Sequence, residues 1–318
     1  MGWIHWAAAA SLALTASAAS AQEQVAAVVS EAVGEFGAEV LQLQDERYQR
    51  MTVPVMINGE GPYNFMVDTG AQASVMSHAL ADQLQLGNRS TATLVGMASE
   101  RQVTTAQIDE LSFGSGSFRD GTAALVDGAN IGGADGILGL DSLANRRILI
   151  DFENRVMEVA HPEERASNRG FDIVVRARQV HGQLIIARAV IDGVRTAVIV
   201  DTGAQGSIGN PALLRRLRSS RHQADTEMTD INGVQASGLV RIARSLEMDR
   251  ASISNFPITF ARSPTFEALG LDEEPAMILG MAELRLFRRV AIDFASRRVL
   301  FDLPEGVRLS NTTDFGRL

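Results

Sequence analysis

The chain has 318 residues, of which 46% are apolar and 21% are charged, and this is the composition of a folded globular protein. Its net charge of −9 argues against a nucleic-acid-binding surface, because such surfaces are basic. The chain has no cysteine, and every one of its 29 basic residues is arginine, so disulfides, thiolate nucleophiles and catalytic lysines are excluded.

An apolar, alanine-rich stretch opens the chain and ends in Ala19-Ser20-Ala21. This pattern predicts a signal peptide over residues 1–21 with cleavage after Ala21, and therefore a periplasmic or secreted protein. The stretch contains no Arg, and an uncleaved anchor is the alternative. Because an alanine- and serine-rich segment spans a bilayer poorly, we expect no stable membrane insertion after cleavage.

Residues 22–50 are acidic, and their apolar residues recur at helical spacing between Val25 and Phe36. The segment predicts an N-terminal leader or a short helix. A propeptide that neutralises paired aspartates needs a cation, and the first basic residue of this segment is Arg47. This late position argues against a propeptide.

From Met51 onward the pattern changes to short β-strands, and its parts occur twice. In each half two apolar runs flank a two-residue turn, Asn58-Gly59 or Asp192-Gly193, which predicts a β-hairpin. Each hairpin ends in the tetrapeptide Asp-Thr-Gly-Ala, at residues 68–71 and 201–204, and a short helical stretch follows.

A second motif, Ile-Leu-Gly, follows in both halves at residues 137–139 and 278–280. The second copy lies slightly farther beyond its tetrapeptide than the first copy does, so the second half carries a modest insertion. We therefore predict a duplicated all-β unit with a boundary near residues 161–168. The expected domains are an N-terminal lobe over 51–162, a C-terminal lobe over 163–305 and a tail over 306–318.

Two aspartates at the ends of apolar strands suit acid–base chemistry. Two carboxyl groups held about 3 Å apart share one proton, so one can act as a base while the other acts as an acid. A water between Asp68 and Asp201 is then deprotonated by one carboxyl and attacks a carbonyl that the other protonates. This chemistry needs no cofactor and no metal, and the five histidines show no metal-ligand spacing.

The other residues of each tetrapeptide suit the support of such a pair. The hydroxyls of Thr69 and Thr202 can hydrogen-bond the backbone of the opposite turn and lock the two turns together. Gly70 and Gly203 permit a close approach that a Cβ atom would oppose.

The order of these motifs, occurring twice, resembles that of the aspartic proteases. Ala71 and Ala204, which follow the glycines, are similar to the retropepsin (retroviral-type) branch, whereas two lobes in one chain are similar to pepsin. The resemblance covers residues ~50 to ~303 and is specific because its motifs are paired. It implies a bilobal fold of two β-barrel-like lobes with short helices, and a monomeric endopeptidase that cleaves peptide or protein substrates.

The same resemblance implies two flaps over the substrate cleft, at hairpin tips that contain Gly96 and Met97 in the first half and Asn232 and Gly233 in the second. Pepsins carry a tyrosine on the first flap, and the two tyrosines of this chain lie elsewhere. Pepsins also carry Ser or Thr in place of each alanine. Because fewer hydrogen-bond donors raise the pKa of a carboxyl group, we expect a less acidic working pH than that of a pepsin.

Two alternatives remain open. In the first, each lobe pairs with its twin in another chain, and the protease is active only as a homodimer. In the second, the protein is a non-catalytic peptide-binding module on the same fold. Asp, Thr and Gly are intact in both copies, which argues against the second alternative, since a binding module does not need two carboxylates.

Overall fold

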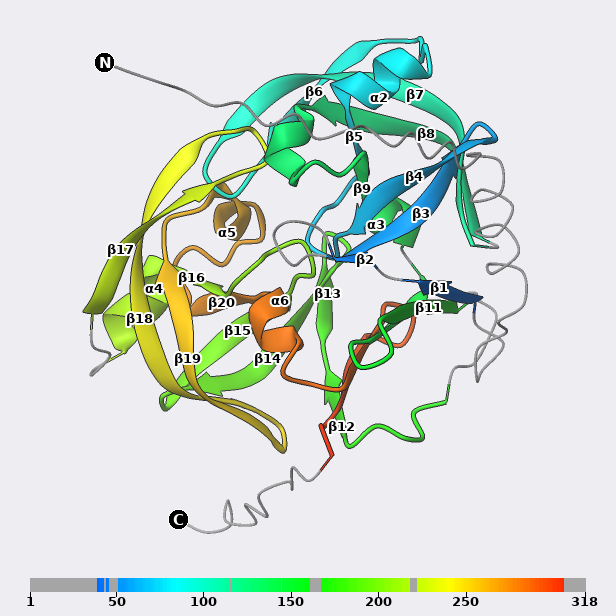
Figure 1. Cartoon of the computed structure of the whole chain (residues 1–318). Helices are drawn as coiled ribbons and strands as arrows, with labels where there is room; N and C mark the ends of the chain where they lie inside the picture. Colours follow the sequence, from blue (N-terminus) through cyan, green and yellow to red (C-terminus); the bar gives the residue numbers. More distant parts are fainter. Residues whose placement is uncertain are drawn as a thin grey trace, which may run out of the picture. The chain divides into compact units, whose positions relative to one another are not determined.

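The computed structural model describes residues 39–42, 44–45, 51–114, 116–143, 145–160, 167–217 and 222–305. It consists mostly of strands with a few short helices, arranged as two sheet-rich lobes, which confirms the predicted fold class (Figure 1). The predicted signal peptide, the apolar positions of the leader from Val25 to Phe36 and the tail over 306–318 lie outside the described residues.

The first lobe is built on an eight-stranded sheet with the order β2-β3-β4-β9-β5-β8-β7-β6, and an additional pairing joins β3 to β7. Its strands are β2 (Gln44–Asp45), β3 (Met51–Ile57), β4 (Glu60–Val67), β5 (Val75–Ser77), β6 (Ser90–Val95), β7 (Glu100–Phe113), β8 (Gly116–Val126) and β9 (Gly136–Leu138).

The second lobe has an eight-stranded sheet in the corresponding order, β13-β14-β15-β20-β16-β19-β18-β17, and β14 also pairs with β18. Its strands are β13 (Arg178–Val180), β14 (Gln183–Ile191), β15 (Val194–Val200), β16 (Ile208–Gly209), β17 (His222–Thr229), β18 (Gln235–Met248), β19 (Ala251–Phe260) and β20 (Ala276–Leu279). Every strand of the first sheet thus has a counterpart at the same place in the second, as expected of a duplicated unit.

The hairpins that open the two lobes turn where the sequence predicts. Asn58 and Gly59 have φ of 51° and 82°, and Asp192 and Gly193 have φ of 47° and 82°. Positive φ at both central residues matches the right-handed twist of the flanking strands, which is why Asn-Gly and Asp-Gly are favoured there. Each hairpin delivers its second strand, β4 or β15, to the centre of its sheet.

The helices are short and lie at strand ends. Helix α2 (His78–Gln83) begins where the Ser77 hydroxyl accepts a hydrogen bond from the Leu80 N–H, and α4 (Pro211–Arg216) begins in the same way at Asn210. Each follows an Asp-Thr-Gly-Ala tetrapeptide, where the sequence predicts a short helical stretch. The others are η1 (Gly128–Ile131), α3 (Leu140–Leu143), α5 (Pro264–Ala268) and α6 (Met281–Leu284).

A third sheet joins the halves of the chain. Its order is β1-β11-β10-β21-β22-β12, and β10 pairs antiparallel with β21, so that Leu149 lies opposite Ala291. Its strands are β1 (Glu39–Gln42), β10 (Arg147–Asp151), β11 (Val156–Ala160), β12 (Ile173–Arg176), β21 (Arg289–Asp293) and β22 (Arg298–Asp302).

Strands β1 and β2 lie at the end of the segment 22–50, for which the sequence predicts a leader or a short helix. Residues 39–42 pair with β11 and residues 44–45 pair with β3, so the end of this segment extends two sheets. In both cases an open strand edge gives the backbone of this segment its hydrogen-bond partners.

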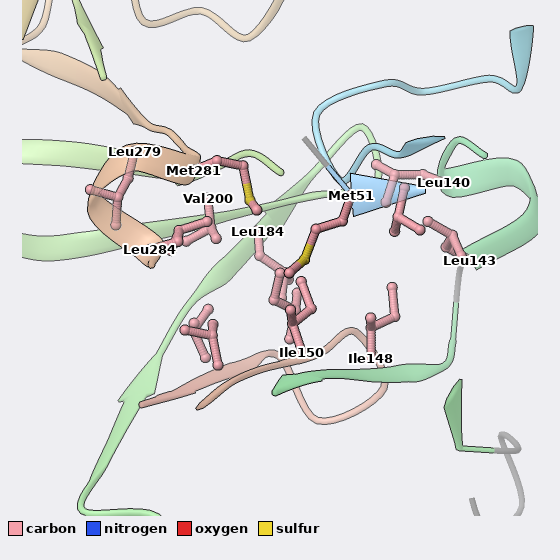
Figure 2. Close-up of a cluster of buried hydrophobic side chains, with 14 of the residues drawn as sticks. Met51, Leu140, Leu143, Ile148, Ile150, Leu184, Val200, Leu279, Met281 and Leu284 are labelled. Atoms are coloured by element: carbon pink, nitrogen blue, oxygen red, sulfur yellow. The ribbon is translucent and has the colours of Figure 1, made fainter. Parts of the chain in front are cut away.

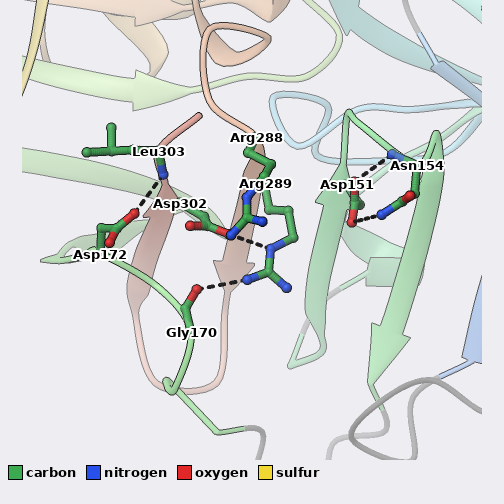
Figure 3. A network of polar contacts seen from close by, with 8 residues as sticks. All are labelled: Asp151, Asn154, Gly170, Asp172, Arg288, Arg289, Asp302 and Leu303. Atoms are coloured by element: carbon green, nitrogen blue, oxygen red, sulfur yellow. Dashed lines mark hydrogen bonds and ion pairs between the residues drawn. The ribbon is translucent and has the colours of Figure 1, made fainter. Parts of the chain in front are cut away.

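A polar network ties the third sheet to the segment that enters the second lobe (Figure 3). The buried Asp302 carboxylate accepts from Arg288 Nη2 at 2.8 Å and from Arg289 Nε at 2.6 Å. Arg289 also donates to the Gly170 carbonyl at 2.8 Å, and Asp172 accepts from the Leu303 N–H at 2.9 Å. Because Asp302 is buried, its two arginine partners supply the compensation that a buried carboxylate needs.

One apolar cluster lies between the three sheets. Met51 of the first lobe, Leu184 of the second and Ile148 of the third sheet all belong to it, and Figure 2 shows these side chains converging. Leu140 and Met281, which directly follow the two Ile-Leu-Gly motifs, belong to the same cluster. The chain just after both motifs is therefore held by one shared core.

Candidate active site

The two aspartates are placed by matching strand pairs. In the first lobe β4 runs parallel to β9 with Val67 opposite Leu138, and the Asp68 N–H donates to the Leu138 carbonyl at 3.1 Å. In the second lobe β15 runs parallel to β20, and the Asp201 N–H donates to the Leu279 carbonyl, also at 3.1 Å. The Ile-Leu-Gly strands thus support the turns that carry the aspartates.

Asp68 and Asp201 lie together, because the carboxyl group of each packs against the glycine of the opposite turn. The glycines make this approach possible. A Cβ atom on Gly70 would lie 2.3 Å from Asp201 Oδ2, and a Cβ atom on Gly203 would lie 2.2 Å from Asp68 Oδ2. Only glycine fits at either position, because each packs directly against the carboxyl group of the opposite turn.

Each carboxyl also accepts hydrogen bonds from its own turn. Asp68 Oδ1 accepts from the N–H groups of Gly70 and Ala71, both at 2.8 Å. Asp201 Oδ1 accepts from Gly203 at 2.8 Å and from Ala204 at 3.2 Å. The two aspartates therefore have corresponding donors, but the hydrogen bond from the alanine N–H is shorter at Asp68 than at Asp201.

The surroundings of Asp201 favour the neutral form of its carboxyl group. Burial raises the pKa of the Asp201 carboxyl well above its ordinary value, and the negative charge of Asp68 raises it further. The hydrogen bonds from Gly203 and Ala204 act in the opposite direction. The pair then holds one proton over a range of pH in which an isolated aspartate would have lost its own.

Thr69 and Thr202 join the two turns as their hydroxyl chemistry suggested. The Thr69 hydroxyl donates to the Val200 carbonyl at 2.9 Å, and the Thr202 hydroxyl donates to the Val67 carbonyl at 2.7 Å. Each hydroxyl also accepts the N–H of the other threonine, at 3.1 and 3.2 Å. Both threonines are buried, so the four bonds fix the turns with little competition from water.

A serine supports each turn from behind, and sequence reasoning missed both. Ser74 and Ser207 occupy the same position after their tetrapeptides, so the signal was present in the sequence. The Ser74 hydroxyl donates to Asp141 at 2.7 Å, and the Ser207 hydroxyl contacts the buried Glu283 carboxyl at 2.5 Å. Burial raises the pKa of Glu283 above its ordinary value.

The same serines reach the Ile-Leu-Gly motifs. Ser74 Oγ accepts the Gly139 N–H at 3.1 Å, and Ser207 Oγ accepts the Gly280 N–H at 3.3 Å. A Cβ atom on either glycine would lie 2.5 Å from the backbone of the segment that follows the tetrapeptide. The glycine of each motif is thus required by close packing against the turn.

Both predicted flap segments are hairpin tips. Gly96 and Met97 lie between β6 and β7, and Asn232 and Gly233 lie between β17 and β18. The tips contact each other through the Asp230 carboxylate, which accepts from the Ser99 hydroxyl at 2.7 Å and from the Ala98 N–H at 3.2 Å.

Asn232 adds a second polar link to this tip contact. Its Nδ2 lies 3.0 Å from Ser99 Oγ and 3.2 Å from the Leu94 carbonyl. Gly96 is enclosed by these side chains, since a Cβ atom there would lie 2.5 Å from Asp230 Oδ2. Asp230 carries no signal in the sequence, because these partners lie in the other half of the chain.

The apolar side chain of each tip packs on the opposite lobe. Met97 contacts a cluster of the second lobe that includes Ile208 and Phe266, and Ala204 borders that cluster. Ile231 contacts a cluster of the first lobe that Ala71 borders. Each tip therefore packs on an apolar cluster that borders the alanine of the opposite lobe's Asp-Thr-Gly-Ala turn.

Among the described residues, no cluster of three or more His, Asp and Glu side chains could hold a metal ion. The same residues contain no helix whose length and apolar character would let it cross a membrane.

The comparisons with known proteins match both halves of the chain. Residues 53–145 are similar to the family described as "gag-polyprotein putative aspartyl protease". Residues 187–282 are similar to the family described as "aspartyl protease". The two matches contain one Asp-Thr-Gly-Ala turn each. A search of curated proteins found no match to the chain.

Proposed function

The chain belongs to the retropepsin-like aspartic proteases, with two aspartyl protease domains in one polypeptide, and we propose that it is an endopeptidase with a single site formed by Asp68 and Asp201. The observation that carries this proposal is the contact of the two turns within one chain, in which the carboxyl group of each aspartate packs against the glycine of the other turn. Catalysis by a pair of carboxyls requires this contact, and a peptide-binding module does not.

In this mechanism the ionised Asp68 takes a proton from a water molecule, and the water oxygen bonds to the carbonyl carbon of a peptide. Asp201 gives its proton to the carbonyl oxygen, so no free oxyanion has to form. The resulting diol collapses as the amide nitrogen takes the proton that Asp68 holds, a diol hydroxyl returns a proton to Asp201, and the C–N bond breaks, which restores both carboxyls. The raised pKa of Asp201 suits the role of acid, because the group keeps its proton near working pH.

The hairpin tips serve as flaps over the bound peptide. Two observations support this role: the tips are joined by Asp230 and Asn232, and Met97 and Ile231 pack on the surfaces beside the aspartates. A peptide that reaches the carboxyls displaces these side chains, and the tip contact then opens. The apolar surfaces so exposed favour peptides with apolar side chains on both sides of the cleaved bond.

Export completes the proposal, with a signal peptide over residues 1–21 and a periplasmic or secreted mature protein. Its support is the apolar stretch that ends in Ala19-Ser20-Ala21. Amino-terminal sequencing of the protein recovered from cell fractions tests it, and a mature terminus at Gln22 is the expected result. Recovery of the intact chain in the membrane fraction would favour an uncleaved anchor instead.

The deciding experiment measures cleavage of a diverse peptide library between pH 3 and 8 by the wild type and by Asp68→Asn and Asp201→Asn variants. Each replacement keeps the shape of the side chain and removes its acid–base function. We expect either change to abolish cleavage by a protein that sedimentation shows to be monomeric. Asp192→Asn, which alters a turn aspartate that accepts two backbone hydrogen bonds elsewhere, is the control.

Each alternative gives a different result in this experiment. Substantial activity in each single variant, together with a dimer in sedimentation, would favour sites formed between two chains. Failure of the wild type to cleave any peptide at any pH would favour a non-catalytic binding module.

A further inference from the structure

A buried glutamine of the second lobe contacts the catalytic turn of the first. Gln183, the first residue of β14, is 2% exposed, and its side-chain amide donates to the Gly70 carbonyl. The corresponding position of the first half is Arg50, which lies outside the described residues. The duplicated sequence therefore does not repeat this glutamine, although it repeats the turn that the glutamine contacts.

The bonded carbonyl belongs to the peptide group that also contacts Asp68. The carbonyl of Gly70 and the N–H of Ala71 are two ends of one peptide unit, and that N–H donates to Asp68 Oδ1 at 2.8 Å. Gln183 is therefore the first member of a chain of hydrogen bonds that runs through this peptide to the carboxylate. A donor to the carbonyl polarises the peptide and strengthens its N–H as a donor.

In the turn of the second lobe, the hydrogen bond from the alanine N–H to the aspartate is longer, as expected if Gln183 strengthens its counterpart in the first lobe. The bond from the Ala204 N–H to Asp201 Oδ1 is 3.2 Å long, against 2.8 Å for its counterpart from Ala71 to Asp68. The two turns have the same sequence and the same threonine bonds. The difference in the length of this bond is therefore attributed to the residues that pack against each turn.

A contribution to stability does not explain why a glutamine occupies position 183. Its other polar atom, Oε1, is buried and has no hydrogen-bond partner among the described residues, and a buried orphan acceptor disfavours folding. A residue that carries such a cost and contacts the catalytic turn is more readily explained by its effect on that turn.

We propose that Gln183 is a positioning residue that makes the two aspartates unequal, by strengthening the Ala71 hydrogen bond to Asp68 and so leaving the shared proton on Asp201. Asp68 is then the base that activates water, and Asp201 is the acid. Each of the two carboxyls faces the other carboxyl and two N–H groups of its own turn. The role of Gln183 in catalysis rests on the proposed function, but the difference in titration between Asp68 and Asp201 can be measured without a substrate.

The test is Gln183→Met, which keeps the length of the side chain and removes the donor. The titration of the Asp68 and Asp201 carboxyl carbons is followed by NMR in protein labelled at aspartate, with the Asp→Asn variants giving the assignment. We expect the Asp68 titration to move upward by about 0.1–0.7 on the pH scale, since polarisation strengthens a charge-assisted hydrogen bond by roughly 10–30%. The acid limb of the kcat/KM profile should move in the same direction.

Gln179→Met is the matched control, because it makes the same change on the neighbouring strand, where an exposed glutamine amide donates to the Gly182 carbonyl. It should leave both titrations in place. Superimposable titrations of wild type and Gln183→Met would overturn the proposal. If the wild type cleaves no peptide, the proposed function fails, and the titrations still decide this inference.

The wild-type protein provides a test that depends on no variant. Its Asp68 carboxyl must titrate at lower pH than Asp201. Equal titrations, or a reversed order, would overturn the proposal even if Gln183→Met did not fold.

Discussion

Thr69 and Thr202 exchange hydrogen bonds across the two lobes, each hydroxyl accepting the backbone N–H of the other threonine. Both are buried, and each hydroxyl also donates to a carbonyl of the opposite strand. The pair therefore joins the ends of β4 and β15, and it holds the aspartates that precede it in register.

Replacing Thr69 with Val should remove the bonds of one hydroxyl while nearly keeping the volume of the side chain. We expect a loss of stability of about 2–4 kcal/mol, because the Thr202 N–H and the Val200 carbonyl are left buried without this partner. Urea denaturation measures the loss. Thr69→Ser keeps the hydroxyl and should recover most of the stability; an equal loss in both variants would show that the hydroxyl is not the cause.

Gly70→Ala should inactivate the enzyme, because the new methyl group would lie 2.3 Å from Asp201 Oδ2 and displace the carboxyl. A misplacement on the order of 1 Å costs on the order of 10²-fold in rate, so we expect at least that loss in kcat/KM. Gly206→Ala is the control, since a Cβ atom there has no neighbour within 4 Å and the first half already carries Ala73 at this position. Comparable activity of the two variants would contradict the close contact.

Glu283→Gln should stabilise the protein increasingly as pH rises. Burial raises the pKa of Glu283 in the folded state, so the folded protein favours the neutral acid. The contribution of this group is present below the pKa of the unfolded chain and is lost as pH rises through the folded pKa. Glutamine cannot ionise, so the variant avoids the loss.

Urea denaturation of wild type and Glu283→Gln from pH 4 to 8 measures this difference in the free energy of unfolding. Glu267→Gln makes the same change at an exposed site and controls for net charge. A difference between Glu283→Gln and wild type that stays constant over this range would refute the expectation.

Joining the hairpin tips should block the enzyme reversibly. The natural chain has no cysteine, so a Ser99→Cys/Asn232→Cys variant carries the only two thiols, at positions whose side-chain atoms lie 3.0 Å apart in the native protein. After reaction with a short, reducible bifunctional thiol reagent, we expect loss of peptide cleavage, and recovery on reduction. The single-cysteine variants, treated in the same way, should stay active. Full activity of the joined protein would show that substrates do not pass between the tips.

The alanines beside the aspartates should set the pH range of activity. Ala71→Ser and Ala204→Ser together can add a donor to each carboxyl, which favours its ionised form and lowers its pKa. The acid limb of the kcat/KM profile should therefore move to lower pH in the double variant. The wild type itself should not peak well below pH 4; such a peak would show that the missing hydroxyls do not govern the range.

The sequence predicted the parts of the site that repeat. Two copies of Asp-Thr-Gly-Ala and of Ile-Leu-Gly indicated two matching lobes. The structure contains both lobes, and each strand of the first eight-stranded sheet has a counterpart in the second. Ser74 and Ser207 repeat in the same way and were open to the same reasoning. Their role was missed because a serine after a turn is compatible with many local structures.

Features of the site that occur in only one half of the chain were not predictable from the local sequence pattern. Gln183 and Asp230 act on residues of the other half of the chain, and each occurs in one half only. Their contacts depend on how the second lobe meets the first, which hydrophobic periodicity does not encode. The same holds for β1, whose residues form a strand because β11 offers an open edge.

The pairing of β10 with β21 has a consequence for how the site forms. Both strands belong to one polypeptide, so bringing Asp68 to Asp201 is a first-order folding step rather than an encounter between two molecules. The second lobe is always present at the high effective concentration that a covalent link provides. Specific activity should then be independent of dilution, so that a single molecule, alone in a large volume, still carries a complete site.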